Sequence, residues 1–355
     1  MDCGCYHAYS MKTLVIGGSG FIGPPLIRGL QRLGHTVAVF HRGTSPTPLP
    51  AGIAHILGDR NQLGVHRTEI RRFGPEIVID LILSSGAQAK ILMDAMRGIA
   101  RRVVAASSMD VYRACGVLHG SEPGALEPLP LTEDSRLRTR LQTYPPEVIK
   151  SLQTTFAWLD NDYDKIPVER EVLAHPELPG TVVRLPMIYG PDDKLHRFFP
   201  VLKRMDDGRQ AIIFSEDFGA WRGMRGYVDN VASAIALAAV SDQATGRIYN
   251  VAEEQAHSEL DWARKIAAET GWLGRFVLLP RERTPKQLLQ PGNAAQHWVA
   301  SSERIRRELG YRESVPIDEA IRRTITWQQA DPPAQIDPAQ FDYAAEDAAL
   351  AESAA

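Results

Sequence analysis

The sequence predicts an α/β fold, a doubly wound parallel sheet with a smaller C-terminal substrate lobe, and two observations support this prediction. The first is a glycine-rich turn at residues 17–23, between a short apolar run and a helical pattern. The second is the alternation of short β-branched runs with longer helical patterns through the first half of the chain. Such alternation is typical of parallel strands whose connecting helices cover both faces of the sheet.

Short apolar runs at several places are expected to be strands of this sheet. They are residues 14–16, 36–40, 53–57, 77–81, 102–106 and 181–185. Helical patterns lie between them, for example over 87–98 and 168–174. Each crossover should be right-handed. A further apolar helix is expected over 231–240, with Asp229 as its N-cap.

The glycine turn is the most specific motif in the chain. Gly17 permits the tight turn, Gly20 lets the backbone approach a pyrophosphate, and Gly23 lets helix and strand pack closely. The helix that follows would direct free N–H groups at the phosphates. The turn therefore predicts a dinucleotide site, with Phe21 and Ile22 beside the ligand. The alternative is a turn that is tight for structural reasons alone.

Composition shifts divide the chain into segments. Residues 1–10 are expected to be a disordered leader. The dinucleotide-binding core is expected over 11–185, with a long insertion at 113–160 that is rich in proline, glycine and charge. Residues 186–330 should build mainly the substrate lobe, with interleaved core segments. Residues 331–355 contain no Lys or Arg and are rich in Ala, Asp, Glu and Pro, so a disordered acidic tail is expected.

Composition also bounds the function. The chain has 355 residues, 44% of them hydrophobic and 23% charged, which is ordinary for a globular protein. A net charge of −3 does not favour nucleic acid or an anionic membrane as partner. Cys3, Cys5 and Cys115 make no disulfide or zinc framework, and no metal site is expected. Without a signal peptide or a long apolar run, the protein is expected in the cytoplasm.

Three phrases of the sequence resemble the extended short-chain dehydrogenase/reductase superfamily, in particular the NAD-dependent epimerase/dehydratase family. The first is the G-x-x-G-x-x-G spacing of residues 17–23. Residues 106–112 are similar to the family's Ser-Ser-x-x-Val-Tyr phrase, and 184–191 to its phrase after the sixth strand. The resemblance covers roughly residues 12–327. It implies a Rossmann-type fold, a nicotinamide dinucleotide and hydride-transfer chemistry.

The second predicted strand indicates which dinucleotide is preferred. NAD-preferring sites place an acidic residue about 20 residues beyond the glycines, on the ribose 2′-hydroxyl. Here Arg42 follows the strand, and its forked donors suit a 2′-phosphate. NADP is therefore expected, with NAD as the alternative and a solvated turn residue as the neutral interpretation. The resemblance also implies cofactor contacts for Asp59, Arg60, Leu81 and Ser107.

The resemblance implies a catalytic serine and tyrosine, and a lysine four residues after the tyrosine. Ser108 takes the serine position, and Tyr163 is the tyrosine candidate. However, Pro167 stands four residues after Tyr163, and Lys165 only two. Residues two apart do not share a helix face, so Lys165 serves only if the helix begins late, near residue 166. A degenerate site, with Tyr163 kept for packing or cofactor contact, is the alternative.

The later phrases provide the expected substrate contacts. Pro186 and Met187 are expected against the nicotinamide, although Met187 replaces an Asn that the family commonly uses on a substrate diphosphate. The resemblance implies that Tyr189, Arg222 and Arg225 contact substrate. Arg225 has an alternative role, as the partner of an acid or a carbonyl. A strand around residue 250 is expected in the second lobe.

Two main hypotheses follow for the function. The first is an NAD(P)-dependent oxidoreductase or epimerase/dehydratase acting on a hydroxyl or carbonyl of a small, nucleotide-sugar-like molecule. The second is a non-catalytic dinucleotide-binding sensor or scaffold, which the missing Tyr-x-x-x-Lys pattern keeps open. RNA binding, known among distant relatives, is disfavoured by the acidic net charge. The expected partners are a small-molecule substrate and a second copy in a homodimer, with no nucleic acid and no membrane.

Overall fold

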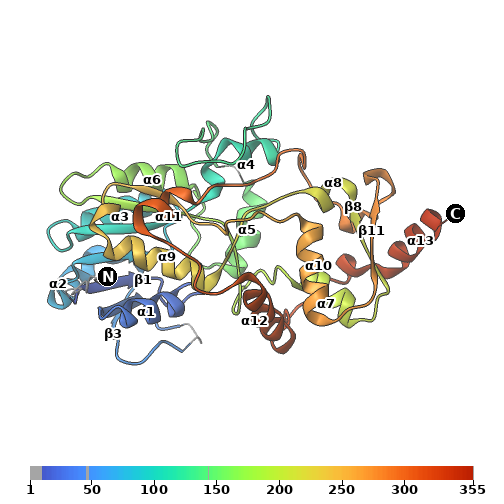
Figure 1. Ribbon diagram of the computed structural model, residues 1–355. Coiled ribbons are helices and arrows are strands. Elements are labelled where there is room, and N and C mark those ends of the chain that lie inside the picture. Colours follow the sequence, from blue (N-terminus) through green and yellow to red (C-terminus); the bar gives the residue numbers. More distant parts are fainter. Residues whose placement is uncertain (1–9, 45–47, 143, 355) are drawn as a thin grey trace, which may run out of the picture.

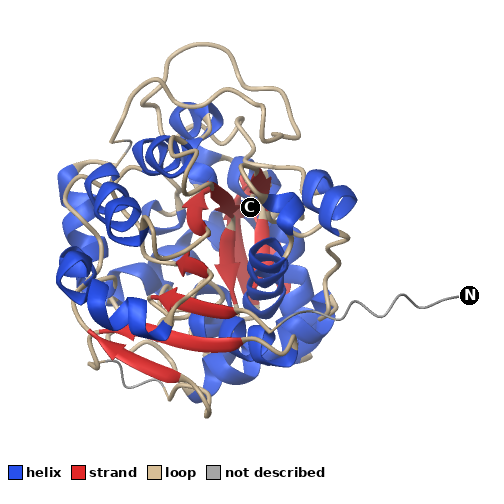
Figure 2. Cartoon of the chain, turned by 90° about the vertical axis from the view of Figure 1, so that its left-hand side faces the viewer, coloured by secondary structure: helices blue, strands red, loops and turns tan. Residues whose placement is uncertain are grey.

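The computed structural model describes residues 10–44, 48–142 and 144–354, so the expected leader lies almost entirely outside the described residues. A parallel sheet of seven strands forms its centre (Figure 2), in the order β10-β6-β5-β4-β1-β2-β3. These strands are β1 (Lys12–Ile16), β2 (Thr36–His41), β3 (Ala54–Leu57), β4 (Ile77–Asp80), β5 (Arg102–Ser108), β6 (Gly180–Leu185) and β10 (Ile248–Asn250). The predicted doubly wound fold is confirmed.

Helices cover both faces of this sheet (Figure 1). They are α1 (Gly23–Arg32) and α9 (Val228–Val240) on one face, and α2 (Arg67–Phe73), α3 (Gly86–Met96) and α6 (Lys165–Leu173) on the other. Successive strand residues point to opposite faces. Val15 accordingly packs in the cluster of α1 and α9, and Leu14 and Ile16 in the cluster of α3 and α6.

A second lobe lies beside the sheet (Figure 1). It holds two short parallel pairs, β8 (Ala211–Ser215) with β11 (Arg275–Leu279) and β7 (Met187–Tyr189) with β9 (Arg225–Tyr227). Its helices are α7 (Phe199–Asp206), α8 (Glu216–Ala220), α10 (Glu259–Thr270), α12 (Ile317–Ala330) and α13 (Tyr343–Ala354). The remaining helices are α4 (Arg113–Leu118) and α5 (Pro146–Thr155) of the insertion, and α11 (Glu303–Leu309).

Two local expectations differ from the structure. The strand around residue 250 does not belong to the second lobe, because β10 pairs with β6 at the edge of the central sheet. Helix α9 begins at Val228, with Tyr227 as its N-cap, so Asp229 lies within the first turn. An acidic side chain there still stabilises the positive end of the helix dipole.

The expectation of a disordered acidic tail also differs from the structure. Helix α13 lies against the β8–β11 pair, where Ala349 and Leu350 contact Ile213 and Leu279. Glu346 is completely buried and forms an ion pair with Arg204 of α7, at 2.6 Å. Arginines from elsewhere in the chain thus neutralise a segment that has no basic residue of its own.

Candidate functional site

The glycine turn joins β1 to α1 at the carboxyl edge of the sheet. Gly17 has a φ of 78°, in the left-handed region that favours glycine. A Cβ on Gly23 would lie 1.9 Å from the carbonyl oxygen of Gly18, so helix and turn are in contact there. A Cβ on Gly20 would meet the carbonyl oxygen of Gly17 alone, at 3.5 Å. The backbone at Gly20 is therefore open to a ligand.

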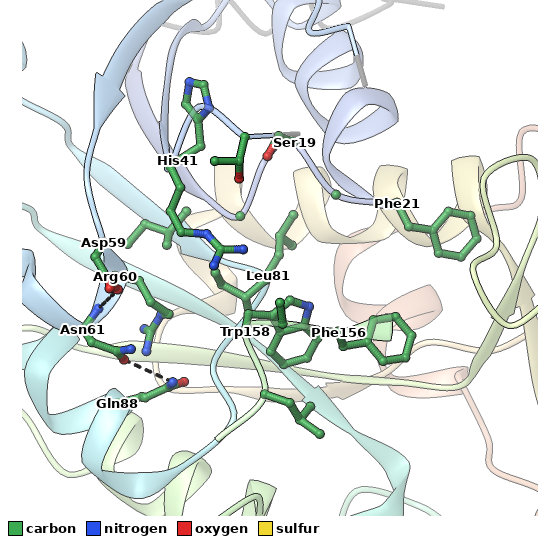
Figure 3. A pocket seen from close by; sticks show the side chains of 18 of the residues that line it. Ser19, Phe21, His41, Asp59, Arg60, Asn61, Leu81, Gln88, Phe156 and Trp158 are labelled. Atoms are coloured by element: carbon green, nitrogen blue, oxygen red, sulfur yellow. Dashed lines mark hydrogen bonds between the residues drawn. The ribbon is translucent and has the colours of Figure 1, made fainter. Parts of the chain in front are cut away.

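A cavity of about 790 Å³ lies over this turn (Figure 3). Its lining comes from the turn, from the ends of β2, β3 and β4, from the insertion, from Gln88 of α3, and from Asp192 and Lys194. Among the predicted cofactor residues, it is lined by Gly17, Gly20, Phe21, Ile22, Arg42, Asp59, Arg60 and Leu81. The structure thus gathers residues that are widely separated in the sequence around one space.

The hydrogen bonds of Arg60 indicate whether this cavity fits a dinucleotide. The side chain is 5% exposed, and its Nη2 donates to Asp80 Oδ2 at 2.7 Å. Its Nε and Nη1 have no hydrogen-bond partner within the described residues. Buried donors are rarely left without an acceptor, so a ligand with acceptor atoms is expected beside them. A phosphate or an adenine ring supplies such atoms, and with Gly20 open above the cavity the residues fit a dinucleotide.

The end of β2 carries the positive charge of this site. Arg42 is exposed and forms no ion pair within the part of the chain that the structure describes. His41 also lines the cavity; its Nδ1 accepts the Gly43 N–H at 3.2 Å, and its Nε2 lies 3.0 Å from Nδ1 of His55. Burial and His55 both lower the pKa of His41, so the imidazole is neutral near pH 7. Arg42 and the exposed Lys194, which also lines the cavity, are therefore cations available to an anionic ligand.

Residues 153 and 155–161, at the end of the insertion and directly after it, form part of the cavity wall, which sequence reasoning missed. Phe156 and Trp158 line the same cavity as Leu81 (Figure 3). The Asp160 N–H donates to Ser84 Oγ at 2.8 Å, and its carboxylate accepts the Ser85 hydroxyl at 2.7 Å. The sequence did offer a signal for this wall, because Phe156 and Trp158 are aromatic residues within an insertion that is rich in proline and charge.

Ser108, Tyr163 and Lys165 come together at the carboxyl ends of β4 and β5, outside the cavity lining. Helix α6 begins at Lys165, so Tyr163 lies on the irregular approach to the helix. The Lys165 ammonium donates to the carbonyl oxygens of Leu83 and Ala106, and lies 5.8 Å from the centre of the Tyr163 ring. A late helix start therefore brings the lysine near the tyrosine despite the wrong spacing.

Burial dominates the electrostatics of this group. It lowers the pKa of Lys165 to about 8, against the attraction of nearby carboxylates. It raises the pKa of Tyr163 well above its ordinary value. The Tyr163 hydroxyl donates to Asp110 Oδ2 at 2.8 Å. Asp110 was not predicted, although it lies inside the Ser-Ser-x-x-Val-Tyr phrase.

Four expected cofactor residues are not part of the cavity lining: Ser107, Pro186, Met187 and Gly23, which packs against Gly18. The Ser107 side chain is buried, and its hydroxyl donates to Glu169 at 2.6 Å. Glu169 itself forms an ion pair with Arg184 in the core. The Ser107 hydroxyl therefore serves the interior and not the cavity. Pro186 and Met187 follow β6, are partly exposed and do not line the cavity either.

The expected substrate contacts are mostly engaged within the protein. Tyr189 is completely buried, and its hydroxyl donates to Glu253 at 2.7 Å. Arg225 takes its alternative role: both carboxylate oxygens of Glu259 accept from it, at 2.6 and 2.7 Å. Its guanidinium also stacks over Trp262. Arg222 is exposed, and its side chain is free to reach solvent.

Metal and membrane features were examined over the same described ranges. No group of three or more His, Cys, Asp or Glu side chains is placed to hold a metal ion there. None of the helices in those ranges is long and apolar enough to cross a bilayer.

Comparison with curated proteins finds reductases and a binding protein, and no family model matches the chain. A 2′-dehydrokanamycin reductase of Streptomyces kanamyceticus is 34% identical over 98 residues, 28% of each chain. A 2-alkyl-3-oxoalkanoate reductase of Stenotrophomonas maltophilia is 24% identical over 347 residues, covering 88% of this chain and 98% of the reductase. The 41 kDa chloroplast stem-loop binding protein b of Arabidopsis thaliana is 23% identical, covering 87% and 77%.

Comparison with solved structures identifies the fold. The enzyme WbmG of Bordetella bronchiseptica, solved with NAD, matches with a TM-score of 0.66 and 17% identity, over 92% of this chain and 96% of that one. The dTDP-glucose 4,6-dehydratase of Bacillus anthracis, also solved with NAD, matches with a TM-score of 0.65 and 14% identity, over 91% and 97%. The chain therefore has the fold of the epimerase/dehydratase and short-chain dehydrogenase/reductase proteins that the sequence resembles.

Proposed function

We propose that this chain is a nicotinamide-dinucleotide-dependent oxidoreductase that acts on a carbonyl or hydroxyl of a small molecule and prefers NADP. The observation that carries the proposal is the cavity over the glycine turn, which is lined by Arg60, whose Nε and Nη1 are buried without a hydrogen-bond partner within the described residues. The solved neighbours with NAD and the two curated reductases support it. Arg42, with no competing ion pair in the described ranges, favours the 2′-phosphate.

Each residue has a defined part in this proposal. The bound dinucleotide supplies or accepts a hydride. Gly17, Gly20 and the start of α1 would hold its pyrophosphate, and Arg60 would donate to its acceptor atoms. Tyr163 donates a proton to the substrate oxygen, which Ser108 orients by a hydrogen bond.

The structure disfavours a nucleotide diphosphate as substrate. Arg225, the cation expected on a substrate phosphate, is bound by Glu259. Met187 replaces the asparagine that the resembled family uses on the diphosphate. We therefore propose a small carbonyl compound without a diphosphate group, and place epimerisation or dehydration of a nucleotide sugar second.

Calorimetric titration with NADPH and NADH, followed by a carbonyl-substrate panel read by nicotinamide absorbance, tests the proposal. Binding of NADPH tighter than NADH, with turnover of at least one carbonyl, is the expected result. Absence of binding to either dinucleotide contradicts it. A cytoplasmic location and a homodimer stay predictions, which cell fractionation and sedimentation would check.

A dinucleotide-binding protein without catalysis is the second candidate, because Pro167 stands where the resembled family has its lysine. Tyr163→Phe and Lys165→Met separate the two. In an enzyme, each should lower turnover about 10²-fold or more while dinucleotide still binds. If neither variant changes a residual activity, the binding-protein hypothesis is preferred. A stem-loop RNA in a filter-binding assay tests the function in the name of the chloroplast relative.

A further inference from the structure

Asp110 is buried beside the candidate tyrosine and is not used by the proposed function. Its side chain is 1% exposed and lies in a short 3₁₀ turn after β5, Met109–Val111. The Asp110 N–H donates to Ser108 Oγ at 3.1 Å, which fixes the turn. Oδ2 accepts the Tyr163 hydroxyl at 2.8 Å, whereas Oδ1 has no partner within the described residues. An oxygen of this carboxyl group is thus free to hold a proton.

Charged and titratable groups face Asp110 from several elements. Arg138 of the insertion donates to its backbone carbonyl at 2.6 Å and forms an ion pair with Asp164. Lys165 and Asp164 face it from the start of α6, and Cys115 from α4, with Tyr144 close to Tyr163. Burial raises the pKa of Asp110, and Arg138, the Tyr163 hydrogen bond and Lys165 oppose the rise.

No lysine stands at the usual spacing after the tyrosine, and the nearby Lys165 is not bonded to the tyrosine hydroxyl. Pro167 carries no charge, and the Lys165 ammonium donates to two backbone carbonyls. The acid–base group bonded to the Tyr163 hydroxyl is therefore a carboxyl group. Tyr163 and Ser108 are partly exposed whereas Asp110 is buried, so the aspartate would act through the tyrosine and not on a substrate directly.

We propose that Asp110 is a positioning residue that stores the proton for Tyr163, in place of the lysine that the family pattern puts four residues after the tyrosine. This inference rests on the proposed function. During reduction the carbonyl carbon gains the hydride and the carbonyl oxygen gains the Tyr163 proton. Tyr163 regains a proton from the Asp110 carboxylic acid, and a solvent proton passed on through the Tyr163 hydroxyl then restores the acid. Oxidation of an alcohol reverses each transfer, so it needs the carboxylate form.

The first test needs neither cofactor nor substrate. Alkaline absorbance titration of the parent, minus that of Tyr163→Phe, isolates the ionisation of Tyr163. Because the Asp110 charge and hydrogen bond both raise the pKa of Tyr163, Asp110→Asn should lower its midpoint by at least one pH unit. Asp134→Asn, an exposed carboxylate bonded to Arg304, is the matched control and should leave the midpoint unchanged. An unchanged midpoint in Asp110→Asn overturns the proposal.

The second test reads turnover against pH. In the parent, the rate of reduction should fall as pH rises through the Asp110 ionisation, and the rate of oxidation should rise over the same window. Asp110→Asn should remove both limbs and lower kcat about 10²-fold, and Asp110→Glu should restore part of each. If the parent binds no dinucleotide, the proposed function itself fails. If the parent turns over and both limbs persist in Asp110→Asn, only the proton-storing role fails.

If Asp110→Asn does not fold, a third measurement tests the proposal without that variant. In the infrared pH-difference spectrum of the parent minus that of Tyr163→Phe, the bands of carboxyl groups that are not bonded to Tyr163 cancel, which leaves the band of Asp110. Because the Tyr163 hydrogen bond lowers the pKa of Asp110, Tyr163→Phe should shift the titration of this band to higher pH. A band that does not respond to Tyr163→Phe contradicts the coupling.

Discussion

Arg42 is the residue on which the choice between the two dinucleotides depends. Its guanidinium is exposed at the end of β2, beside a neutral His41, and lines the same cavity as the glycine turn. Hydrogen bonds between charged groups contribute about 1.5–3 kcal/mol, or roughly 10- to 100-fold in affinity. We expect Arg42→Ala to weaken NADP(H) by that factor and to leave NAD(H) unchanged, by calorimetric titration.

Arg32→Ala is the matched control for this prediction. Arg32 is an exposed arginine in the last turn of α1 and does not line the cavity. The variant should bind both dinucleotides as the parent does. Tighter binding of NAD(H) than NADP(H) by the parent contradicts the assignment of Arg42.

The contacts of single residues also show why their roles were hard to predict from the sequence. Arg225 had two possible partners from the sequence, a substrate phosphate or an acid. Glu259, 34 residues away, settles its position through two short hydrogen bonds. Tyr189 similarly lies under Trp262 and Phe198, and its hydroxyl is bound by Glu253. A sequence motif does not reveal whether a side chain will be buried in the core or will face a ligand.

At the scale of elements, the β1–turn–α1 unit makes a prediction about Gly20. Because a Cβ there meets nothing nearer than 3.5 Å, a valine should be tolerated by the fold but should fill the space needed by a pyrophosphate. We expect Gly20→Val to unfold at nearly the parent temperature and to lose dinucleotide binding. Circular dichroism checks the fold, and calorimetry checks the binding. Undiminished affinity in the folded variant would show that the turn is merely structural.

Helix α13 gives a second prediction at this scale. Glu346 and Arg204 are both buried, so removal of one partner leaves an uncompensated charge, at a cost of about 3–5 kcal/mol. Glu346→Ala should lower the free energy of unfolding by that amount in urea. Asp347→Ala is the control: its ion pair with Arg209 is more exposed and should contribute about 1 kcal/mol or less. Equal effects of the two variants would contradict a docked helix.

At the scale of the whole molecule, Glu253 should link stability to pH. Burial raises the pKa of this carboxyl group from 4.5 to about 7. Between those values the folded state binds more protons than the unfolded state, so stability falls as pH rises through the window. Glu253→Gln should remove this slope and, above pH 7, stabilise the protein by up to about 3 kcal/mol.

Urea unfolding at a series of pH values measures this effect. Glu254→Gln, at the exposed neighbouring position, is the control and should keep the slope of the parent. A Glu253→Gln variant whose stability varies with pH as the parent's does would show that Glu253 ionises normally.

The central fold, and the gathering of several predicted residues around one cavity, were predictable because both depend on local patterns. The glycine turn needs a backbone conformation and a close approach that few residues allow, so its sequence is distinctive. Parallel strands end at one edge of the sheet, so residues after successive strands had to meet there. Arg42, Asp59 and Leu81 follow β2, β3 and β4 and all line the cavity, as this rule requires.

Tertiary structure alone decided what depends on partners far apart in the chain. Strand β10 joins the central sheet through β6, and α13 is ordered by an arginine 142 residues before Glu346. The Tyr163 hydroxyl meets Asp110 across 53 residues. Composition showed only that residues 331–355 are acidic, and spacing showed only that no lysine stands four residues after Tyr163. Which partners these groups have was decided by burial, since a charge in a low-dielectric interior is stable only where the fold brings a partner to it.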